Sequence, residues 1–391
     1  MSNDARRRRR RHGGVAVIAG LALAAAGCAS SPDPGSRSGA ARARTVTVDL
    51  TPQGCAPKPA RISAGQVRFT VTNSGAGAVS EAELRTADLA HILGEQENLT
   101  PGLSGGFTLD IQPGRYTISC PGASRPHWAL TVSGKATGTA WPSEPRLAAA
   151  VAGYSRYVNQ DVAGLITGTR AFCAAIDAGQ MTRAQLLYPK ARVYYERIEP
   201  VAEIWGSLDT AIDGRWENPV TVASQFTGFH KIEQLLWQDR TLAGAPPLCA
   251  GLLKNQQQLL QLVRQAQYNP LEMASGATDL INEAATSKIS GEEERYSHTD
   301  FPVFAANVDG AMEVVALLRP YLQQKDSALV SVIQRRDAAV AGRLAGYRAS
   351  PGYDGTGYVA YSTVPDSQRR QLAAAVNALA EAMSRIPVRV S

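Results

Sequence analysis

The spacing of the apolar residues changes near residue 134, and this change constrains the fold more than any other feature of the chain. Before it, the segments 45–50, 66–72 and 107–111 alternate apolar with polar residues, as half-buried strands do. After it, residues 146–391 are rich in Ala, Leu, Gln, Arg and Glu, with apolar residues at helical spacing. The sequence therefore predicts a β domain, a linker over residues 134–145, and an all-α domain.

The predicted β domain covers residues 45–133, the size of a β-sandwich. Pro-Gly and Asn-Ser-Gly sequences mark turns between its strands, and a closing strand follows at 129–132. The segments Phe69–Asn73, Gln112–Cys120 and Leu130–Val132 together resemble the cupredoxin family. This resemblance implies a cupredoxin-like sandwich that could hold a metal ion.

The candidate ligands of this sandwich differ from those of blue-copper proteins, which use two histidines, a cysteine and commonly a weak methionine. Glu81 stands near the expected first histidine, no methionine follows Cys120 before residue 134, and His127 is shifted along the chain. Other candidates are Cys55, Glu83, Glu95 and Glu97. We expect Cys55, Glu81 and Cys120 to capture Cu²⁺ or Fe³⁺, without blue-copper electron transfer. A structural Cys55–Cys120 disulfide is the alternative.

The C-terminal part is long enough for more than one four-helix bundle, and we predict paired bundles. The helices are expected near residues 146–166, 168–179, 182–209, 219–238, 248–268, 271–290, 301–324, 326–346 and 366–386.

A His-x-x-Glu motif lies in the predicted helix 219–238. The stretch Phe226–Trp237 is apolar over most of its circumference, so this part of the helix should be buried. His230 and Glu233 are one turn apart, and an ionised carboxylate in such a place is costly without a partner. A metal ion bound by both side chains would be such a partner, and iron, zinc or manganese would suit this pair of ligands. A simple hydrogen bond between the two side chains is the alternative.

Two further acidic segments could complete a metal site. Glu196 and Glu199 lie one turn apart on a predicted helix. Residues 282–300 combine a helix end with a loop that is dense in oxygen donors, and Asp300 is a candidate N-cap of the next helix. This loop could close over a site begun by His230 and Glu233.

Four segments in order carry a second resemblance: Tyr195–Pro200, Phe226–Glu233, Glu283–Lys288 and Gly291–Asp300. Together they resemble the imelysin-like (M75-type) family, and more narrowly its EfeO-type iron-uptake lipoproteins, in which a cupredoxin domain often precedes the helical domain. The resemblance implies a helical body of paired four-helix bundles that binds Fe²⁺ or Fe³⁺. It also implies delivery of iron to a membrane permease, with a haem-dependent Dyp-type peroxidase in the same system.

The same resemblance suggests which residues bind the metal. Carried over position by position, His230 and Glu233 are the expected ligands and Glu199 is the expected third ligand. The weaker candidates are Glu196, Glu294 and Asp300.

Residues 1–28 resemble a lipoprotein signal peptide. The arginines Arg6–Arg11 precede the apolar stretch Val15–Ala26, and small residues lead to Cys28 as in a bacterial lipobox, with Ala25 in place of the usual Leu. We expect lipidation of Cys28, a flexible linker at 29–44, and anchoring outside the cytoplasm on the cell membrane. An ordinary cleaved signal is the alternative, and the sequence leaves Sec or Tat export open.

Charge and cysteine content limit the partners and the compartment. Removal of residues 1–27 leaves 34 basic and 33 acidic residues of the 40 and 34 in the chain, so nothing favours nucleic-acid binding. With Cys28 lipidated, four cysteines remain for an oxidising compartment, and Cys173 and Cys249 are a plausible disulfide pair because nothing ligand-like surrounds them.

Three functions compete at this point. The first is non-enzymatic capture of iron for transport, with an affinity that falls as pH drops through the titration range of the histidine. The second is an M75-type zinc peptidase with Glu196 or Glu199 as base, although the chain lacks an H-E-x-x-H motif. The third is a polysaccharide or protein docking module. A ferroxidase-like step in the cupredoxin domain also stays open.

Overall fold

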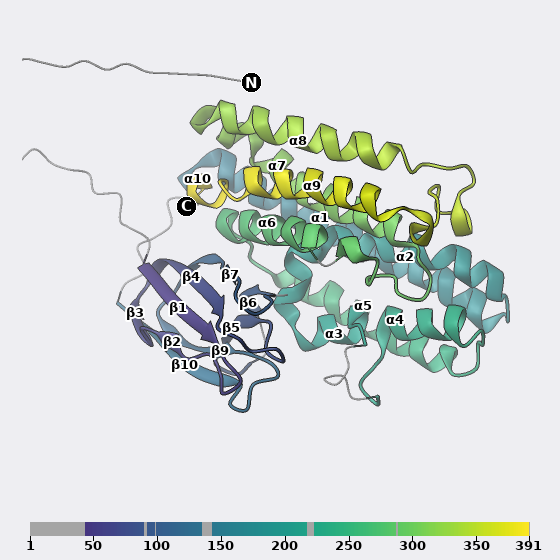
Figure 1. The fold of residues 1–391 in the computed structure, drawn as a ribbon, viewed down its shortest axis with the longest axis horizontal. Coiled ribbons are helices and arrows are strands. Elements are labelled where there is room, and N and C mark those ends of the chain that lie inside the picture. The colour runs from purple at the N-terminus through teal and green to yellow at the C-terminus, as the bar shows by residue number, and fades with distance from the viewer. Residues whose placement is uncertain are drawn as a thin grey trace, which may run out of the picture. The chain divides into compact units, whose positions relative to one another are not determined.

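A computed structural model describes residues 44–89, 92–97, 99–134, 143–216, 223–286 and 288–390, apart from the side chains of Asp110 and Glu203. These residues belong to one compact unit (Figure 1). The predicted signal peptide, the lipidated Cys28 and nearly all of the predicted N-terminal linker lie outside the described residues, as does most of the interdomain linker.

The N-terminal domain is a sandwich of two five-stranded mixed sheets, ordered β2-β1-β4-β7 with β8 also on β4, and β3-β10-β9-β5-β6. The strands are β1 (Arg44–Leu50), β2 (Pro57–Lys58), β3 (Arg61–Ser63), β4 (Gly65–Asn73), β5 (Ala82–Thr86), β6 (Ile92–Gln96), β7 (Ser104–Gly105), β8 (Thr108–Ile111), β9 (Gly114–Ser119) and β10 (His127–Ser133). β1 runs parallel to β4 and β3 runs parallel to β10, whereas the other pairs are antiparallel.

The alternation seen in the sequence builds the core of this sandwich. Val67, Phe69 and Val71 on β4 are buried, and the residues between them are more exposed. The ring of Phe69 stacks on that of Phe107 with centroids 4.8 Å apart. β5 and β6 were not predicted. Two charged residues among the five of β5 obscure its pattern, although they form an ion pair with each other, Glu83 with Arg85.

Both cysteine pairs form disulfides, Cys55 with Cys120 and Cys173 with Cys249. The prediction that Cys55 and Cys120 bind a metal ion is therefore wrong for this oxidised protein, because a disulfide offers no thiolate. The sandwich instead contains the structural Cys55–Cys120 disulfide that the sequence offered as the alternative. Glu81 remains as a candidate ligand without its two predicted sulfur partners.

Asn73 ties together the loops at one end of the sandwich. Its fully buried side-chain amide donates to the carbonyls of Ala76, Val79 and Leu99, at 3.0, 3.0 and 2.6 Å. Its Oδ1 accepts the N–H groups of Gly75 and Ala76. One side chain thus satisfies backbone groups from two separate loops.

The substitution Asn73→Ala is expected to lower the free energy of unfolding by about 2–4 kcal/mol, because buried backbone groups lose their partners. Chemical denaturation measures this loss. Asn159→Ala on a helix surface is the matched control, since the Asn159 side chain donates one hydrogen bond, to the carbonyl of Ser155. The control should lose less than about 1 kcal/mol. Equal stability of the two variants would contradict the assigned role of Asn73.

The C-terminal domain is helical and has one continuous hydrophobic core. Its helices are α1 (Pro145–Asp177), α2 (Met181–Ala202), α3 (Ser207–Asp213), α4 (Gly228–Glu233), α5 (Ala245–Gln265), α6 (Pro270–Thr286), α7 (Asp300–Lys325), α8 (Ser327–Ala345), α9 (Asp366–Met383) and α10 (Pro387–Val390). Short turns add η2 (Glu203–Trp205), η3 (Gln234–Gln238), η4 (Lys288–Ser290), η5 (Tyr353–Gly355) and η6 (Tyr361–Thr363). α6 to α9 pack as one group, α1, α2 and α5 as a second, and α2 contacts α7 between them (Figure 1).

Three helix predictions differ from the structure. The single helix expected over 182–209 ends as α2 at Ala202, and the chain passes through η2 into the separate helix α3, which begins at Ser207. The break expected at residue 167 is absent, because α1 is continuous from Pro145 to Asp177. Gly168 does not end the helix but allows α2 to approach, since a Cβ there would lie 3.0 Å from the Cα of Ala191. The helix expected over 219–238 begins only at Gly228, and residues 234–238 form a π-helical turn.

Among the helices that the structure describes, α7 has the length and hydropathy of a membrane span. Of its apolar window, 61% is buried inside the protein. The same helix packs against α1, α2, α6 and α8, as a core helix does. The hydropathy of α7 is therefore explained by packing.

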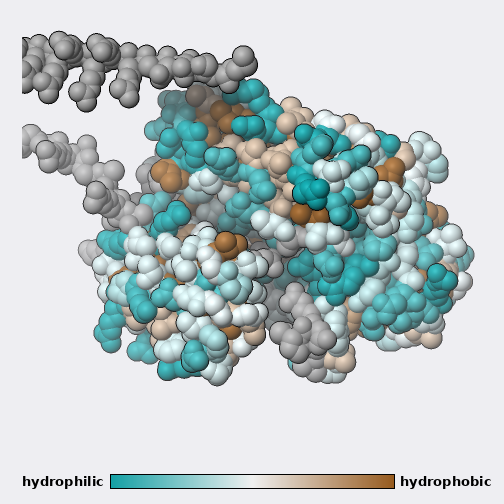
Figure 2. Space-filling model, in the orientation of Figure 1, coloured by the Kyte–Doolittle hydropathy of each residue, from teal (hydrophilic) through white to brown (hydrophobic). Residues whose placement is uncertain are grey.

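The face of the protein in Figure 2 is mainly hydrophilic, with hydrophobic residues in small separate areas. Large exposed apolar side chains among the described residues are Leu103, Leu186 and Val388. They lie far apart in the sequence, and single exposed apolar residues of this kind are common on protein surfaces.

Candidate metal centre

Gly228 places the His-x-x-Glu motif against the end of α3. Its φ of +74° starts α4, and a Cβ at this position would lie 2.2 Å from the carbonyl oxygen of Ile212. Only glycine fits this close approach without displacing the backbone. The hydroxyl of Thr227 also donates to the carbonyl of Ala211 at 3.2 Å. As a result, His230 lies beside Asp213, the last residue of α3.

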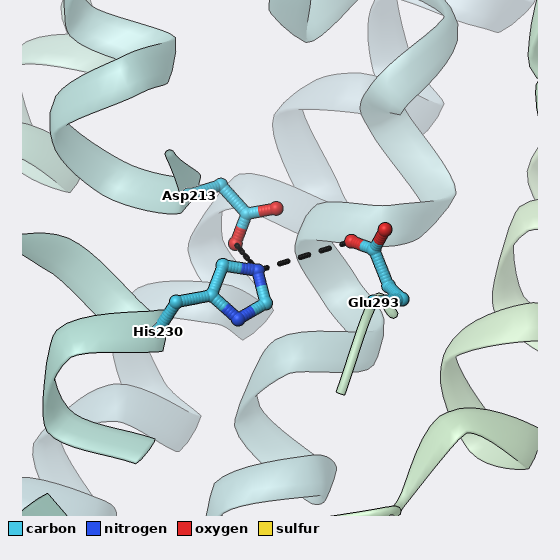
Figure 3. A group of neighbouring side chains, drawn as sticks. All are labelled: Asp213, His230 and Glu293. Carbon is cyan, nitrogen blue, oxygen red and sulfur yellow. Dashed lines mark ion pairs between the residues drawn. The ribbon is translucent and has the colours of Figure 1, made fainter. Parts of the chain in front are cut away.

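The imidazole of His230 is buried, with 2% of its surface exposed, and its two nitrogens have different surroundings. Nδ1 and Oε2 of Glu233 share a hydrogen bond of 3.0 Å. Nε2 lies 3.9 Å from both Oδ1 of Asp213 and Oε1 of Glu293 (Figure 3). Among the described residues it has no hydrogen-bond partner. When Glu233 accepts the Nδ1 proton, the lone pair of Nε2 faces these two carboxylates.

This arrangement fits a metal ion. Ligand atoms about 2.1 Å from one ion are about 3.0–3.4 Å from each other. The three ligand atoms of Asp213, His230 and Glu293 all lie within 4.8 Å of one another, so contraction by about 1 Å would suffice. One imidazole and two carboxylates suit iron, manganese or zinc better than a soft ion.

Glu233 supports the imidazole from the other side. Its Oε1 accepts the backbone N–H groups of Tyr296 and Ser297 at 3.0 and 2.7 Å. These bonds hold the carboxylate so that its second oxygen orients the ring of His230, as partners of metal-bound histidines do. His230, Glu233 and Glu294 also form a second group with metal-ligand spacing.

Arg192 links the carboxylates around this centre. Its fully buried guanidinium forms ion pairs with Asp213 and Glu294, and with Glu196 and Glu293 at 2.6 Å each. Burial of four carboxylates would be costly without such a charge. Arg192 thereby fixes Asp213 and Glu293 where they face His230.

Several predicted ligands lie elsewhere. Glu199 pairs with Lys288 and accepts a hydrogen bond from Asn307, and it is absent from both groups with metal-ligand spacing among the described residues. Glu196 pairs with Arg192. Asp300 accepts the backbone N–H of Glu294 at 3.2 Å, and it is the first residue of α7 rather than the predicted N-cap, which is Thr299.

A pocket of about 270 Å³ lies between the sandwich and the helical domain and reaches Asp213 and Glu293. The sandwich contributes Glu81, Glu83, Arg85, Ile92, Glu95 and Glu97 to its lining. The helical domain contributes Glu199, Gly206, Asp209, Thr210, Asp213, Gly214, Arg215, Glu283 and Glu293. The predicted ligand Glu81 therefore lines an acidic pocket that two of the candidate ligands, Asp213 and Glu293, also line.

Burial sets the protonation of the centre. It lowers the pKa of His230 well below its usual value, so the imidazole is neutral at neutral pH. It raises the pKa of Glu233 and brings that of Glu294 to about 8. Burial also acts on Glu293, but Arg215, Lys288 and Arg192 outweigh it and lower the pKa of that carboxyl. These directions make the protons of the buried carboxyl groups, rather than the ordinary titration of the histidine, the expected source of any pH dependence of metal binding.

Sequence reasoning missed the roles of Asp213, Glu293, Arg192 and Lys288. Arg192 precedes Glu196 by one helical turn, and this spacing could have revealed their ion pair. Lys288 and Glu293 lie inside the segments that carried the family resemblance. No local spacing connects Asp213 to His230, because the contact depends on how α3 and α4 pack.

Comparisons with known proteins agree with this architecture. The family described as Imelysin (peptidase M75) matches residues 150–386, more than half of the chain, and a cupredoxin-like domain matches residues 16–132. In fold alone, the chain resembles a crystal structure from Parabacteroides distasonis that is described as a "putative iron-regulated protein A precursor". The TM-score is 0.50 at 13% identity, over 63% of this chain and 96% of that chain.

The proteins that are similar to most of this chain are named as iron-uptake components. The "Iron uptake system component EfeO" of Escherichia coli (strain K12) is 35% identical over 345 residues, which is 87% of this chain and 90% of that protein. The proteins of that name from Shigella flexneri and Shigella sonnei give the same values. The chain therefore belongs to the imelysin family, as an EfeO-type member with an N-terminal cupredoxin-like domain.

Proposed function

We propose that the protein is the iron-binding component of an Efe-type uptake system, which captures iron outside the cytoplasm and delivers it to a membrane permease. The observation that carries this proposal is the buried, unpartnered Nε2 of His230 between Asp213 and Glu293. The names of the EfeO relatives support iron as the cargo. The haem-dependent Dyp-type peroxidase of such systems is the second proposed partner.

His230, Asp213 and Glu293 are the proposed ligands of the iron. Glu233 orients the imidazole, and Glu294 belongs with His230 and Glu233 to the second group with metal-ligand spacing. Glu81 is proposed as part of the acidic entrance rather than of a thiolate site, since the sulfurs of the sandwich form a disulfide. The sequence of residues 1–28 supports a membrane anchor at lipidated Cys28.

The enclosure of the centre supports capture rather than peptide hydrolysis. A catalytic zinc site needs an open coordination position that the substrate can reach. Glu233 is fully buried, and the pocket that leads to Asp213 and Glu293 holds about 270 Å³. This space suits a hydrated ion better than a folded or extended polypeptide.

Substitution of His230 by alanine tests the proposal. We expect His230→Ala to weaken iron binding by at least about tenfold, because the site loses its nitrogen ligand. Metal analysis and titration with Fe²⁺, Fe³⁺, Cu²⁺ and Zn²⁺ measure the effect. His127→Ala is the matched control, because His127 is exposed on the sandwich, and this variant should bind iron as the wild type does.

Two results would contradict the proposal. One is equal iron affinity of the wild type and His230→Ala, with both folded by circular dichroism. The other is zinc-dependent peptide hydrolysis by the wild type that Glu233→Ala abolishes, which would make the protein a peptidase.

A further inference from the structure

Lys288 holds an ammonium group inside the carboxylate cluster. Its side chain is 2% exposed, and Nζ pairs with Oε1 of Glu199. Nζ also lies 3.6 Å from Oε2 of Glu196, 3.8 Å from Oε1 of Glu293 and 3.9 Å from Oε2 of Glu283. Carboxylate oxygens on several sides of one cation are also the environment that a metal ion takes.

The lysine and the candidate metal centre share an atom. Oε1 of Glu293 lies 3.8 Å from Nζ of Lys288 and 3.9 Å from Nε2 of His230. Glu199, Glu283 and Glu293 also line the interdomain pocket. An ion that enters through this pocket and binds beside His230 therefore meets a carboxylate that faces a resident cation.

Lys288 and Arg192 hold these carboxylates differently. The planar guanidinium of Arg192 has close ion pairs with four carboxylates, so it is fixed. Among the described residues, Lys288 has one close partner, Glu199, and its separations from Glu196, Glu283 and Glu293 exceed hydrogen-bond length. An ammonium on a flexible stem with one close partner can shift away from Glu293 while it keeps Glu199.

We propose that Lys288 is a built-in competitor of the bound ion, an inference that rests on the proposed function. Its ammonium shares the negative charge of Glu293 with the ion and repels the ion at short range. Lys288 therefore lowers the affinity of the centre and favours release of the cargo. A protein that must hand its ion to a partner needs such a limit on affinity.

The test compares the full-length mature protein with Lys288→Met, a variant of similar length without charge. The probes are Fe²⁺ under anaerobic conditions and Zn²⁺, each titrated against a competing chelator at about pH 7. We expect Lys288→Met to bind both ions at least about tenfold more tightly, because repulsion is lost. Lys231→Met is the matched control, because it removes the same charge from a lysine whose side chain donates a hydrogen bond to Gln234. It should keep the wild-type affinity.

A purely structural role of Lys288 predicts the opposite sign. If the lysine only holds the site together, Lys288→Met binds the ions more weakly, and the proposal is overturned. Unchanged affinity in a folded Lys288→Met overturns it as well. Failure of the wild type itself to bind either ion would instead refute the proposed function, so the two failures are distinguishable.

A second comparison covers the case in which Lys288→Met does not fold. Glu199→Gln and the double variant Glu199→Gln/Lys288→Gln differ by the lysine charge, and the double variant removes the close pair together. If the double variant binds the ions more tightly than Glu199→Gln does, competition by Lys288 is supported. Equal or weaker binding by the double variant overturns it.

Discussion

Replacement of Arg192 by methionine should lower the free energy of unfolding by about 3–5 kcal/mol at neutral pH, the range seen when one partner of a buried ion pair is removed. The guanidinium is fully buried and pairs with Asp213, Glu196, Glu293 and Glu294. Methionine fills part of the volume but leaves these carboxylates without their shared cation. Thermal or chemical denaturation of the metal-free protein measures the loss.

The pH dependence of this loss gives a second check. Carboxyl groups that take up protons no longer need a counter-ion, so the difference between Arg192→Met and the wild type should shrink from pH 8 to pH 5. Arg183→Met on the same helix is the control, because Arg183 is exposed and bonds to Gln180. It should change stability by less than about 0.5 kcal/mol. A loss that small in Arg192→Met would show that the buried ion pairs are not needed for folding.

Iron affinity should rise by about 100-fold or more between pH 6 and pH 8, about tenfold per pH unit for each proton displaced. Burial raises the pKa of Glu294 to about 8 and that of Glu233 above its usual value, so these groups beside the imidazole carry protons that the positive charge of a bound ion would displace. Burial lowers the pKa of His230, so the imidazole needs no deprotonation in this range.

The stability of the metal-free protein should change with pH in the direction opposite to iron affinity. A carboxyl whose pKa is raised on folding, such as Glu294 at about 8 or Asp300 at about 7, binds more protons in the folded than in the unfolded state. Its contribution is complete below the unfolded pKa and is lost as pH rises through the folded value. The metal-free protein should therefore become less stable from about pH 5 to pH 8, and bound iron should offset this loss.

Titration calorimetry in buffers of different ionisation enthalpy measures the protons released on binding. Glu294→Gln removes one of the groups that carry a proton, so the slope of affinity against pH should become flatter in this variant. An affinity that is constant between pH 6 and pH 8 would show that the buried carboxyls are already ionised without metal.

Features of the structure that depend on the spacing of nearby residues were predicted well from the sequence. The alternation in β4 and the helical periods of α7 and α8 are properties of short segments, so they are visible without the tertiary structure. The contact between His230 and Glu233 is also local, because residues three apart share a face of a helix. The fold class and the family followed from these segments and their order, and the comparisons confirm both.

The rest of the centre depends on contacts between distant segments. Asp213 and Glu293 reach Nε2 of His230 from the end of α3 and from the loop before α7. Glu199 looked equivalent to these residues in the sequence, but Lys288 engages it in the structure. Spacing within one helix cannot show which distant carboxylate has a competing cation. Our proposal therefore places Asp213 and Glu293 beside the imidazole, where the sequence predicted Glu199.

The contact between Gly228 and the carbonyl of Ile212 has a consequence for how this centre can evolve. The aspartate and the imidazole are brought into register by two stretches of main chain that touch each other. A single methyl group at residue 228 would push the two stretches of main chain apart. It would thereby separate Asp213 from His230 without altering either side chain.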